Sequence, residues 1–225
     1  MLLVDTADNG LILEALKFPA VRGFTTNPTL MAHAAGAESL RISEYIARAR
    51  ELCHLPKNQA VSHIDHLMIQ AVGSREHMLE QAAIYSGELK TTSGTRLWIK
   101  LPPTQQGIAC CPALKKLGCA TLVTAVYTAT QALVAMEAGA DGIAVYLGRM
   151  MRLEDDWEAQ LERIAKVVSE AGKMLLLASF PDIQTVERAL DYSRDLTVPP
   201  NVLQGILESP HSEDALKGFD SKILK

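Results

Sequence analysis

The stretch Arg96-Leu-Trp-Ile-Lys-Leu101 decides the fold. Side chains on a β-strand point alternately to its two faces, so its three aliphatic residues share one face and Trp98 and Lys100 share the other. The aliphatic face suits packing against helices. Trp98 and Lys100 must then point to the inside of a closed sheet. This strand therefore predicts a barrel that holds a lysine in its lumen.

Seven further runs resemble this strand, and helix-period stretches separate most of them. The eight expected strands are Leu2–Thr6, Gly23–Asn27, Leu67–Val72, Leu97–Leu101, Thr121–Val126, Gly142–Leu147, Met174–Phe180 and Leu196–Pro199. The clearest expected helices are Ser74–Ser86, Gln105–Leu117, Thr128–Ala138 and Glu154–Ala171. Eight strands alternating with helices predict an α/β fold, a (β/α)8 TIM barrel.

The chain of 225 residues shows no linker or repeat, so we expect a single domain over 1–225. Ser39–Cys53 is expected to be a helix, followed by an unusually long loop from His54 to Asp65. An extra C-terminal helix is expected at about residues 212–225. It carries Leu216, Phe219 and Ile223 at helical spacing, so it is either a cap or an arm that contacts a neighbouring subunit.

Composition excludes several classes of function. Twenty-two basic and 26 acidic side chains give a net charge of −4, which offers no electrostatic footprint for nucleic acid or an anionic membrane. Aromatic residues are 5%, too few for a stacking platform. The start, Met1-Leu-Leu-Val-Asp5, has no basic n-region, and no apolar run reaches the ~18 residues of a membrane span. Four cysteines without a secretory context are expected to be reduced thiols, so we expect a cytoplasmic protein.

The alternation of faces can be applied to the other strands. It directs outward the residues Val4, Phe24, Leu67, Ile69, Ala71, Val123, Ala125, Ile143, Val145 and Leu147. The polar residues that it leaves in the lumen are Asp5, Thr25, Asn27, Gln70, Lys100, Thr124, Tyr146 and Ser179. They lie near the C-terminal ends of their strands, where the active sites of barrel enzymes are found.

Lys100 carries the chemistry in this set. Burial in a barrel disfavours a charged ammonium, and a neutral amine attacks carbonyls to form a Schiff base. Two other readings remain open at this point: a lysine that reaches the solvent at the rim, and a structural ion pair with Asp5. Taken singly, Tyr146 is equally compatible with packing, and Asn27 before Pro28 with a turn.

No metal or nucleotide site is expected. His63-Ile-Asp-His66 precedes the third strand and therefore lies at the N-terminal face, away from the chemistry, and no other His spacing supplies a third ligand. There is no Walker loop and no Gly-x-Gly-x-x-Gly after the first strand.

Five short motifs in chain order resemble the small transaldolases, and particularly the fructose-6-phosphate aldolase branch. They are Thr25-Thr-Asn-Pro-Thr29, Ile99-Lys-Leu-Pro102, Thr124-Ala-Val-Tyr127, Tyr146-Leu-Gly-Arg149 and Ala178-Ser-Phe180. The similarity extends over nearly the whole chain, from Val4 to Pro199.

The resemblance implies class I aldol chemistry through Lys100, no cofactor, and a ring-built homo-oligomer, with a decamer among the candidate assemblies. It implies catalytic roles for Lys100, Tyr146, Gln70 and Asp5, and substrate contacts by Thr25, Asn27, Thr124, Arg149 and Ser179. Arg149 and Ser179 match positions that hold the substrate phosphate. Gln70 and Tyr146 are the residues of the aldolase branch, because transaldolases carry Glu and Phe there.

The sequence departs from the family pattern where Pro181 replaces a basic residue, in Val198-Pro-Pro-Asn201, and in the insertion around His54–Asp65. We therefore expect a class I aldolase that cleaves or forms the C3–C4 bond of a ketose or ketose phosphate. The alternatives are a transaldolase that transfers a dihydroxyacetone unit and a non-catalytic barrel that binds sugar phosphates. The expected partner is a small sugar or sugar phosphate, with no nucleic acid and no membrane.

Overall fold

The computed structural model describes residues 1–225 except 59–63, 90–93, 221 and 223–225. Eight parallel strands form a closed barrel in chain order, each paired with the next and β8 paired with β1. They are β1 (Leu2–Asp5), β2 (Val21–Thr25), β3 (His66–Gln70), β4 (Arg96–Leu101), β5 (Ala120–Val126), β6 (Gly142–Tyr146), β7 (Met174–Ala178) and β8 (Asp195–Val198). The predicted (β/α)8 barrel is confirmed.

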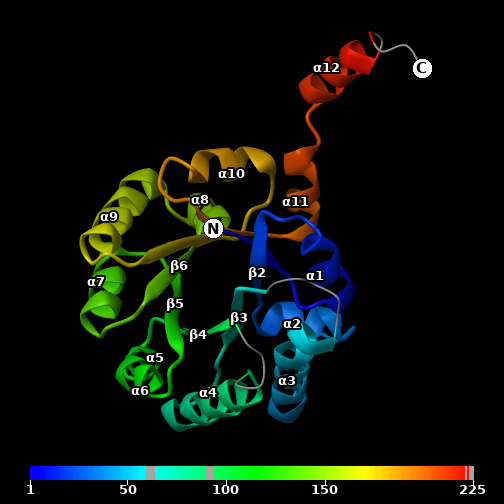
Figure 1. The fold of residues 1–225 in the computed structure, drawn as a ribbon. Helices are drawn as coiled ribbons and strands as arrows, with labels where there is room; N and C mark the ends of the chain where they lie inside the picture. Colours follow the sequence, from blue (N-terminus) through cyan, green and yellow to red (C-terminus); the bar gives the residue numbers. More distant parts are fainter. Residues whose placement is uncertain (59–63, 90–93, 221, 223–225) are drawn as a thin grey trace.

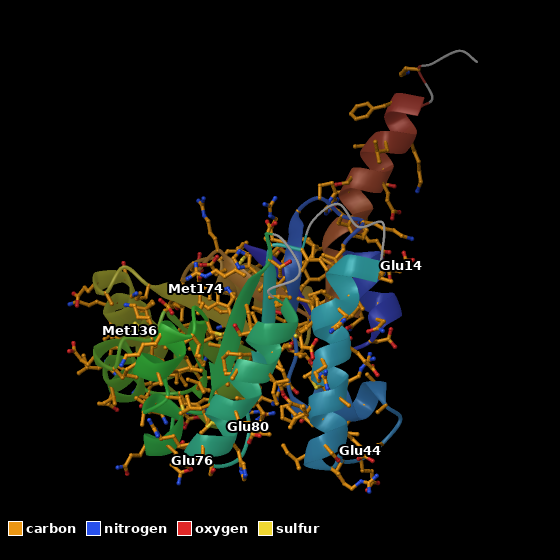
Figure 2. All side chains as sticks on the ribbon, turned by 60° about the horizontal axis from the view of Figure 1, so that its bottom comes forward. Glu14, Glu44, Glu76, Glu80, Met136 and Met174 are labelled. Atoms are coloured by element: carbon orange, nitrogen blue, oxygen red, sulfur yellow. The ribbon has the colours of Figure 1, made fainter. Side chains whose placement is uncertain are left out.

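Helices surround the barrel on its outside (Figure 1). They are α1 (Asn9–Ala15), α2 (Pro28–Ala34), α3 (Ile42–Asn58), α4 (Arg75–Leu89), α5 (Gln105–Ile108), α6 (Cys111–Lys116), α7 (Ala129–Glu137), α8 (Leu147–Leu153), α9 (Trp157–Glu170), α10 (Ile183–Ala189), α11 (Pro200–Leu207) and α12 (Pro210–Asp220). Glu14, Glu44, Glu76 and Glu80 of these helices lie at the periphery in Figure 2.

The structure corrects two of the expected segments. Helix α3 continues to Asn58 where a loop was expected from His54, because Leu55 is buried and the His54 ring hydrogen-bonds Glu88 of α4 at 2.6 Å. Residues 59–63 of the expected loop lie outside the described residues. The expected helix Gln105–Leu117 is two helices, α5 and α6. Pro112 lacks an N–H, so it is accommodated in the first turn of α6 rather than in a helix interior.

The barrel wall separates two apolar clusters. The outer cluster lies between strands and helices and includes nearly all the aliphatic residues expected to point outward. The inner cluster fills the lumen with Leu3, Met68, Trp98, Ala120, Leu122, Ala144 and Leu176. Most of these residues lie in the first part of their strands. The middle of the lumen is therefore a packed apolar plug, and the polar side chains of the candidate site lie toward the C-terminal ends of the strands.

Ala125 does not follow its predicted outward direction. The β5–β6 register shifts between Thr124 and Val126, and Ala125 has φ +59°. Val126, rather than Ala125, joins the outer cluster. A β-bulge inserts one residue into a strand and so changes which later side chain points to which face. The alternation rule holds up to Thr124 and fails one residue later.

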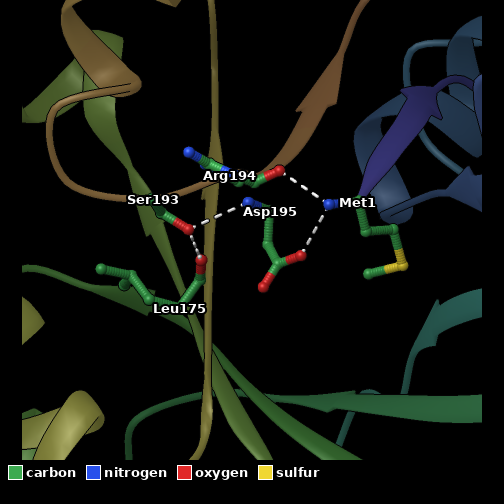
Figure 3. Close-up of polar contacts among 5 residues, drawn as sticks. All are labelled: Met1, Leu175, Ser193, Arg194 and Asp195. Carbon is green, nitrogen blue, oxygen red and sulfur yellow. Dashed lines mark hydrogen bonds and ion pairs between the residues drawn. The ribbon is translucent and has the colours of Figure 1, made fainter.

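Side-chain contacts strengthen the closure of the barrel at β8 (Figure 3). The Ser193 hydroxyl donates to the carbonyl of Leu175 on β7 at 2.6 Å and accepts from the N–H of Asp195 at 3.0 Å. The Met1 ammonium donates to the carbonyl of Arg194 and to the Asp195 carboxylate, at 2.7 and 2.9 Å. These bonds attach the start of β8 to both of its neighbours, where the β7–β8 pairing is short.

Helix α12 projects away from the barrel in both general views (Figures 1 and 2). It begins at Pro210 and confirms the predicted extra helix, except that Ile223 lies outside the described residues. Leu216 and Phe219 are 58% and 65% exposed. No helix in the described part of the chain is long and apolar enough to cross a membrane.

The N-terminal end of the barrel carries a histidine that belongs to the fold rather than to a metal site. The Trp98 indole N–H donates to Nδ1 of His66 at 3.0 Å, and the guanidinium of Arg96 lies 4.5 Å from the Trp98 ring centroid. His63 of the apparent metal cluster lies outside the described residues. Among the described residues no group of three His, Cys, Asp or Glu side chains is placed to hold a metal ion.

We expect the stability of the barrel to fall in mild acid because of His66. Burial lowers the pKa of His66 below its ordinary value of 6.5, an effect that Arg96 and Arg22 reinforce and Asp65 and Asp195 oppose. The unfolded chain therefore takes up a proton that the folded chain resists, and the free energy of unfolding decreases as the pH falls through about 6.5.

Urea unfolding at pH 7.5 and pH 5.5 measures this effect. His66→Asn keeps a side-chain acceptor for Trp98 without a group that titrates here, so its unfolding midpoint should fall less over this range. If the unfolding midpoint of His66→Asn fell as much between pH 7.5 and pH 5.5 as that of the wild type, the pH dependence would not come from His66.

Candidate active site

The predicted lumen residues meet at the C-terminal end of the barrel. Asp5, Thr25, Gln70 and Tyr146 are each the last residue of their strand. Lys100 is one residue from the end of β4 and pairs in register with Gln70 of β3. Register pairing places the side chains of paired residues on the same face of the sheet. A lysine, a carboxylate, an amide and a phenol are thus set around one mouth.

Lys100 is fully enclosed by the barrel. It is 3% exposed, and its Nζ donates a hydrogen bond to the carbonyl of Thr26 at 3.0 Å. The reading in which Lys100 reaches the solvent is therefore wrong. The structural ion pair with Asp5 is also not formed in the part of the chain that the structure describes, although the Lys100 charge acts on that carboxyl. A buried amine with one neutral acceptor is suited to act as a nucleophile.

Asp5 is hydrogen-bonded by a hydroxyl group, which in turn contacts a second hydroxyl. Thr25 donates to Asp5 Oδ1 at 2.6 Å, and Oγ1 of Thr25 lies 2.7 Å from Oγ1 of Thr197. Burial raises the pKa of Asp5 above its ordinary value of 3.8, whereas the charge of Lys100 and the Thr25 hydrogen bond oppose the rise. Thr197 was not predicted, because one threonine in a short apolar strand gives no pattern.

Tyr146 and Thr124 are in direct contact. The Thr124 hydroxyl donates to the Tyr146 hydroxyl at 3.3 Å, and Thr124 is 1% exposed. The guanidinium of Arg149, which lies in α8 directly after β6, is 5.4 Å from the Tyr146 ring centroid. The phenol is therefore oriented from both sides, with one lone pair of its oxygen already occupied.

Two buried side chains from the outer helices hold the end of β3. The Tyr45 hydroxyl of α3 donates to the carbonyl of Gln70 at 2.6 Å. Gln81 of α4 accepts from the N–H of Val72 at 3.1 Å and donates to its carbonyl at 2.7 Å. Burial raises the pKa of Tyr45, which keeps it a hydrogen-bond donor. Neither residue was predicted, since one polar residue within a helix gives no pattern that marks it as buried.

Asn27 lies just beyond β2 and not within it. Its Oδ1 accepts from the N–H of Leu30 at 3.0 Å, so Asn27 is the N-cap of α2 and Pro28 opens that helix. Asn-Pro is thus a helix cap rather than the turn that was considered, and the cap leaves the Asn27 Nδ2 group to meet a ligand. The carbonyl of the preceding Thr26 is the acceptor for Lys100, so the cap and the lysine are coupled through the backbone.

The loop after β7 contacts the start of α8 closely. Ser179 directly follows β7 with φ +68°, and its carbonyl accepts from the N–H of Gly148 at 3.1 Å. A Cβ on Gly148 would lie 2.1 Å from the Ser179 carbonyl oxygen and 2.8 Å from Cδ of Pro181. Gly148 is therefore required for this approach, which places Ser179 beside the helix that carries Arg149.

Arg149 also lies near Tyr127. Burial raises the pKa of Tyr127, and the charge of Arg149 opposes that rise. The Tyr127 hydroxyl oxygen is buried without a well-formed hydrogen bond within the described residues. Arg149 itself is exposed at the rim. The positions predicted to hold an anion thus lie together on the β6 and β7 side of the mouth.

These features define a class of protein. A closed (β/α)8 barrel with an apolar plug below and a buried lysine among polar groups above belongs with barrel enzymes that act on small substrates.

The comparisons identify the family. The model of the "Transaldolase/Fructose-6-phosphate aldolase" family matches residues 2–223. "Probable transaldolase 2" of Bacillus anthracis is 31% identical over 224 residues, covering 96% of this chain and 94% of that protein. "Probable transaldolase" of Thermus thermophilus is 29% identical over 223 residues, covering 97% and 95%. The chain belongs to the transaldolase/fructose-6-phosphate aldolase family, and it is an enzyme of the aldolase type.

One solved structure supports the fold alone. A crystal structure of 2,3-dimethylmalate lyase, described as a member of the PEP mutase/isocitrate lyase superfamily, superposes with a TM-score of 0.61 at 15% identity. The match covers 99% of this chain and 83% of that one.

Proposed function

We propose that the protein is a lysine-dependent aldolase that cleaves or forms the C3–C4 bond of a ketose or ketose phosphate, as fructose-6-phosphate aldolases do. The observation that carries the proposal is the Lys100 amine, which is buried at the polar end of the lumen and donates to one neutral acceptor. Only a lysine in its neutral form can attack a ketone, and the acceptor of Lys100 is a backbone carbonyl rather than a carboxylate.

The reaction begins when the Lys100 nitrogen attacks the C2 carbonyl of the donor. Loss of the carbonyl oxygen as water gives an iminium. In cleavage, the electron pair of the C3–C4 bond moves into the iminium and forms an enamine, while the C4 hydroxyl loses its proton and C4 leaves as an aldehyde. Protonation of the enamine at C3 and hydrolysis then release the three-carbon ketone and the free amine.

Tyr146 is the proposed acid–base group. It exchanges the proton through a water held by Gln70 and Thr124, and the Thr124–Tyr146 hydrogen bond supports this placement of the phenol. Asp5, in its anionic form, and the Nδ2 group of Asn27 hold donor hydroxyls and fix the bond to be broken. General acid–base help of this kind typically contributes about 10²–10⁴-fold.

Transaldolase is the second candidate, and the names of the relatives favour it. In that reaction the same enamine waits for an aldehyde acceptor. Gln70 and Tyr146 are the aldolase-branch residues, and both lie at the last position of their strands at the mouth. We therefore place aldolase first. Turnover without an added acceptor separates the two activities, and absence of any turnover would favour the non-catalytic binder.

The side of the mouth that carries Arg149 and Ser179 supports a weak preference for phosphorylated substrates. Arg149 can form charge-assisted, bidentate hydrogen bonds to a tetrahedral oxyanion. Pro181, which stands in place of a basic residue, supplies neither a charge nor an N–H. We propose that short unphosphorylated aldehydes are accepted together with sugar phosphates.

A homo-oligomer is proposed from α12. Its residues Leu216 and Phe219 are more than half exposed. Neighbouring exposed apolar side chains of this kind mark contact surfaces. The helix stands clear of its own barrel (Figure 1), so the cover for these residues is expected from a neighbouring subunit of a ring-built assembly.

Lys100 should form the covalent intermediate. Reduction with borohydride in the presence of fructose 6-phosphate, fructose or dihydroxyacetone should leave an adduct on the peptide that contains Lys100, measured by mass spectrometry. Lys100→Met should abolish both the adduct and turnover, while Lys116→Met, at an exposed position of α6, should retain both. An adduct on another lysine would overturn the proposed mechanism.

Tyr146→Phe should lower the aldol rate by at least about tenfold, within the range for a general acid–base group. The substitution keeps the ring, so the unfolding free energy should change by no more than about 1 kcal/mol, the value of one hydrogen bond. Steady-state kinetics and urea unfolding measure the two effects. Tyr192→Phe, whose ring packs on Trp157, is the matched control and should keep the wild-type rate. Unchanged activity in Tyr146→Phe would return this residue to a packing role.

Light scattering should give a mass of several subunits for the full chain. The double variant Leu216→Glu, Phe219→Glu places charges on the exposed apolar face of α12 and should shift the mass to smaller species. Lys217→Glu, on the same helix, should not. A monomeric wild-type protein would refute the assembly.

A further inference from the structure

The hydroxyl groups beside Asp5 have a fixed order of donation. A threonine hydroxyl has one proton and accepts through its lone pairs, whereas an ionised carboxylate only accepts. Thr25 therefore gives its proton to Asp5 Oδ1 across 2.6 Å. The 2.7 Å contact between Thr25 and Thr197 must then be a hydrogen bond that Thr197 donates. The order of donation is Thr197 to Thr25 to Asp5.

Thr197 places a hydroxyl group in an apolar part of the barrel. It is 1% exposed on β8, pairs in register with Leu3, and lies between Leu196 and Val198, which both point to the outer cluster. Its side chain therefore points into the lumen, toward the apolar plug. Burying a hydroxyl among apolar groups is costly unless it is hydrogen-bonded, and Thr25 supplies the bond.

The charged groups around Asp5 leave its carboxylate dependent on the hydrogen bonds from Thr197 to Thr25 and from Thr25 to Asp5. Lys100, from across the lumen, is the charge that acts on Asp5. Asp195, on the same strand as Thr197, is occupied by the Met1 ammonium at the other end of the barrel. Helix α11, which packs on β1, has no charged residue between Pro200 and Leu207. Among the described residues, the Thr25 hydroxyl is thus the donor that contacts this carboxylate directly.

We propose that Thr197 is a positioning residue that acts through Thr25, directing the Thr25 proton onto Asp5 and so keeping Asp5 anionic and fixed in orientation. This inference rests on the proposed function, in which Asp5 accepts a hydrogen bond from a donor hydroxyl. A hydroxyl that itself accepts a hydrogen bond is a stronger donor, because consecutive bonds polarise one another by about 10–30%. Thr197 therefore influences the reaction without touching the substrate.

The titration of the Asp5 carboxyl carbon, followed by NMR in the protein without substrate, tests the chain directly. Thr25→Val removes the bond to Asp5 and should raise its pKa by about one unit. Thr197→Val has nearly the shape of threonine and should raise the pKa in the same direction by about 0.3 unit, the share due to polarisation. Thr197→Ser restores the hydroxyl and should restore the wild-type titration.

Thr121→Val is the matched control. Thr121 is also a fully buried strand threonine, but its hydroxyl bonds to Asp141 on the opposite side of the barrel, so this variant should leave the Asp5 titration unmoved. An Asp5 pKa that is unchanged in Thr197→Val, or that shifts equally in Thr121→Val, would overturn the proposal.

Kinetics give the second readout. In Thr197→Val, kcat should fall about twofold, in line with the indirect share of about 0.3 unit, with a smaller change in KM. The acid limb of the kcat/KM profile should move to higher pH, because Asp5 must lose its proton to act. The NMR titration tests the hydrogen bonds from Thr197 to Thr25 and from Thr25 to Asp5, and its result does not depend on whether Lys100 forms an adduct with a donor. Failure of this inference and failure of the aldolase proposal therefore give different results.

Discussion

The hydrogen bond from the Lys100 amine to the carbonyl of Thr26 joins the chemistry of the site to the architecture of the barrel. The acceptor is a backbone carbonyl between Thr25 and Asn27, at the point where β2 ends and α2 begins. The amine is therefore buried with its partner fixed by a strand end and a helix cap. Since a carbonyl carries no formal charge, it positions the nitrogen without stabilising the ammonium as a carboxylate would.

Asp5, like Lys100, has a neutral hydrogen-bond partner. Burial raises the pKa of its carboxyl, and the opposing influences are the charge of Lys100 and the hydrogen bond from Thr25. A direct Lys100–Asp5 ion pair would stabilise both charged forms and would make the amine a poor nucleophile. Asp5 is instead hydrogen-bonded by Thr25, which contacts Thr197, and Lys100 is bonded to the carbonyl of Thr26, so the carboxyl and the amine are held by different partners.

The period-2 pattern of strands predicted the face of most candidate site residues, because a closed sheet leaves only two directions for a side chain. It placed Asp5, Gln70 and Lys100 correctly. It failed at Ala125, where a bulge breaks the period, and it placed Asn27 inside a strand that ends two residues earlier. Thr197, Tyr45 and Gln81 were not predictable. Each is one polar residue in an apolar setting, and its partner is a group far away in sequence.

Strain in the backbone marks the side of the mouth where the substrate's far end is expected. Among the described residues, Ala125 and Ser179 are the non-glycine residues with positive φ, and they follow Thr124 and Ala178 on β5 and β7. Such conformations cost about 1–3 kcal/mol each and persist only where the surroundings enforce them. At Ser179 the enforcing contact is the bond from Gly148, which tolerates no Cβ. The strain at Ser179 therefore depends on α8, the helix that also carries Arg149, so one close contact fixes how Ser179 and Arg149 lie relative to each other.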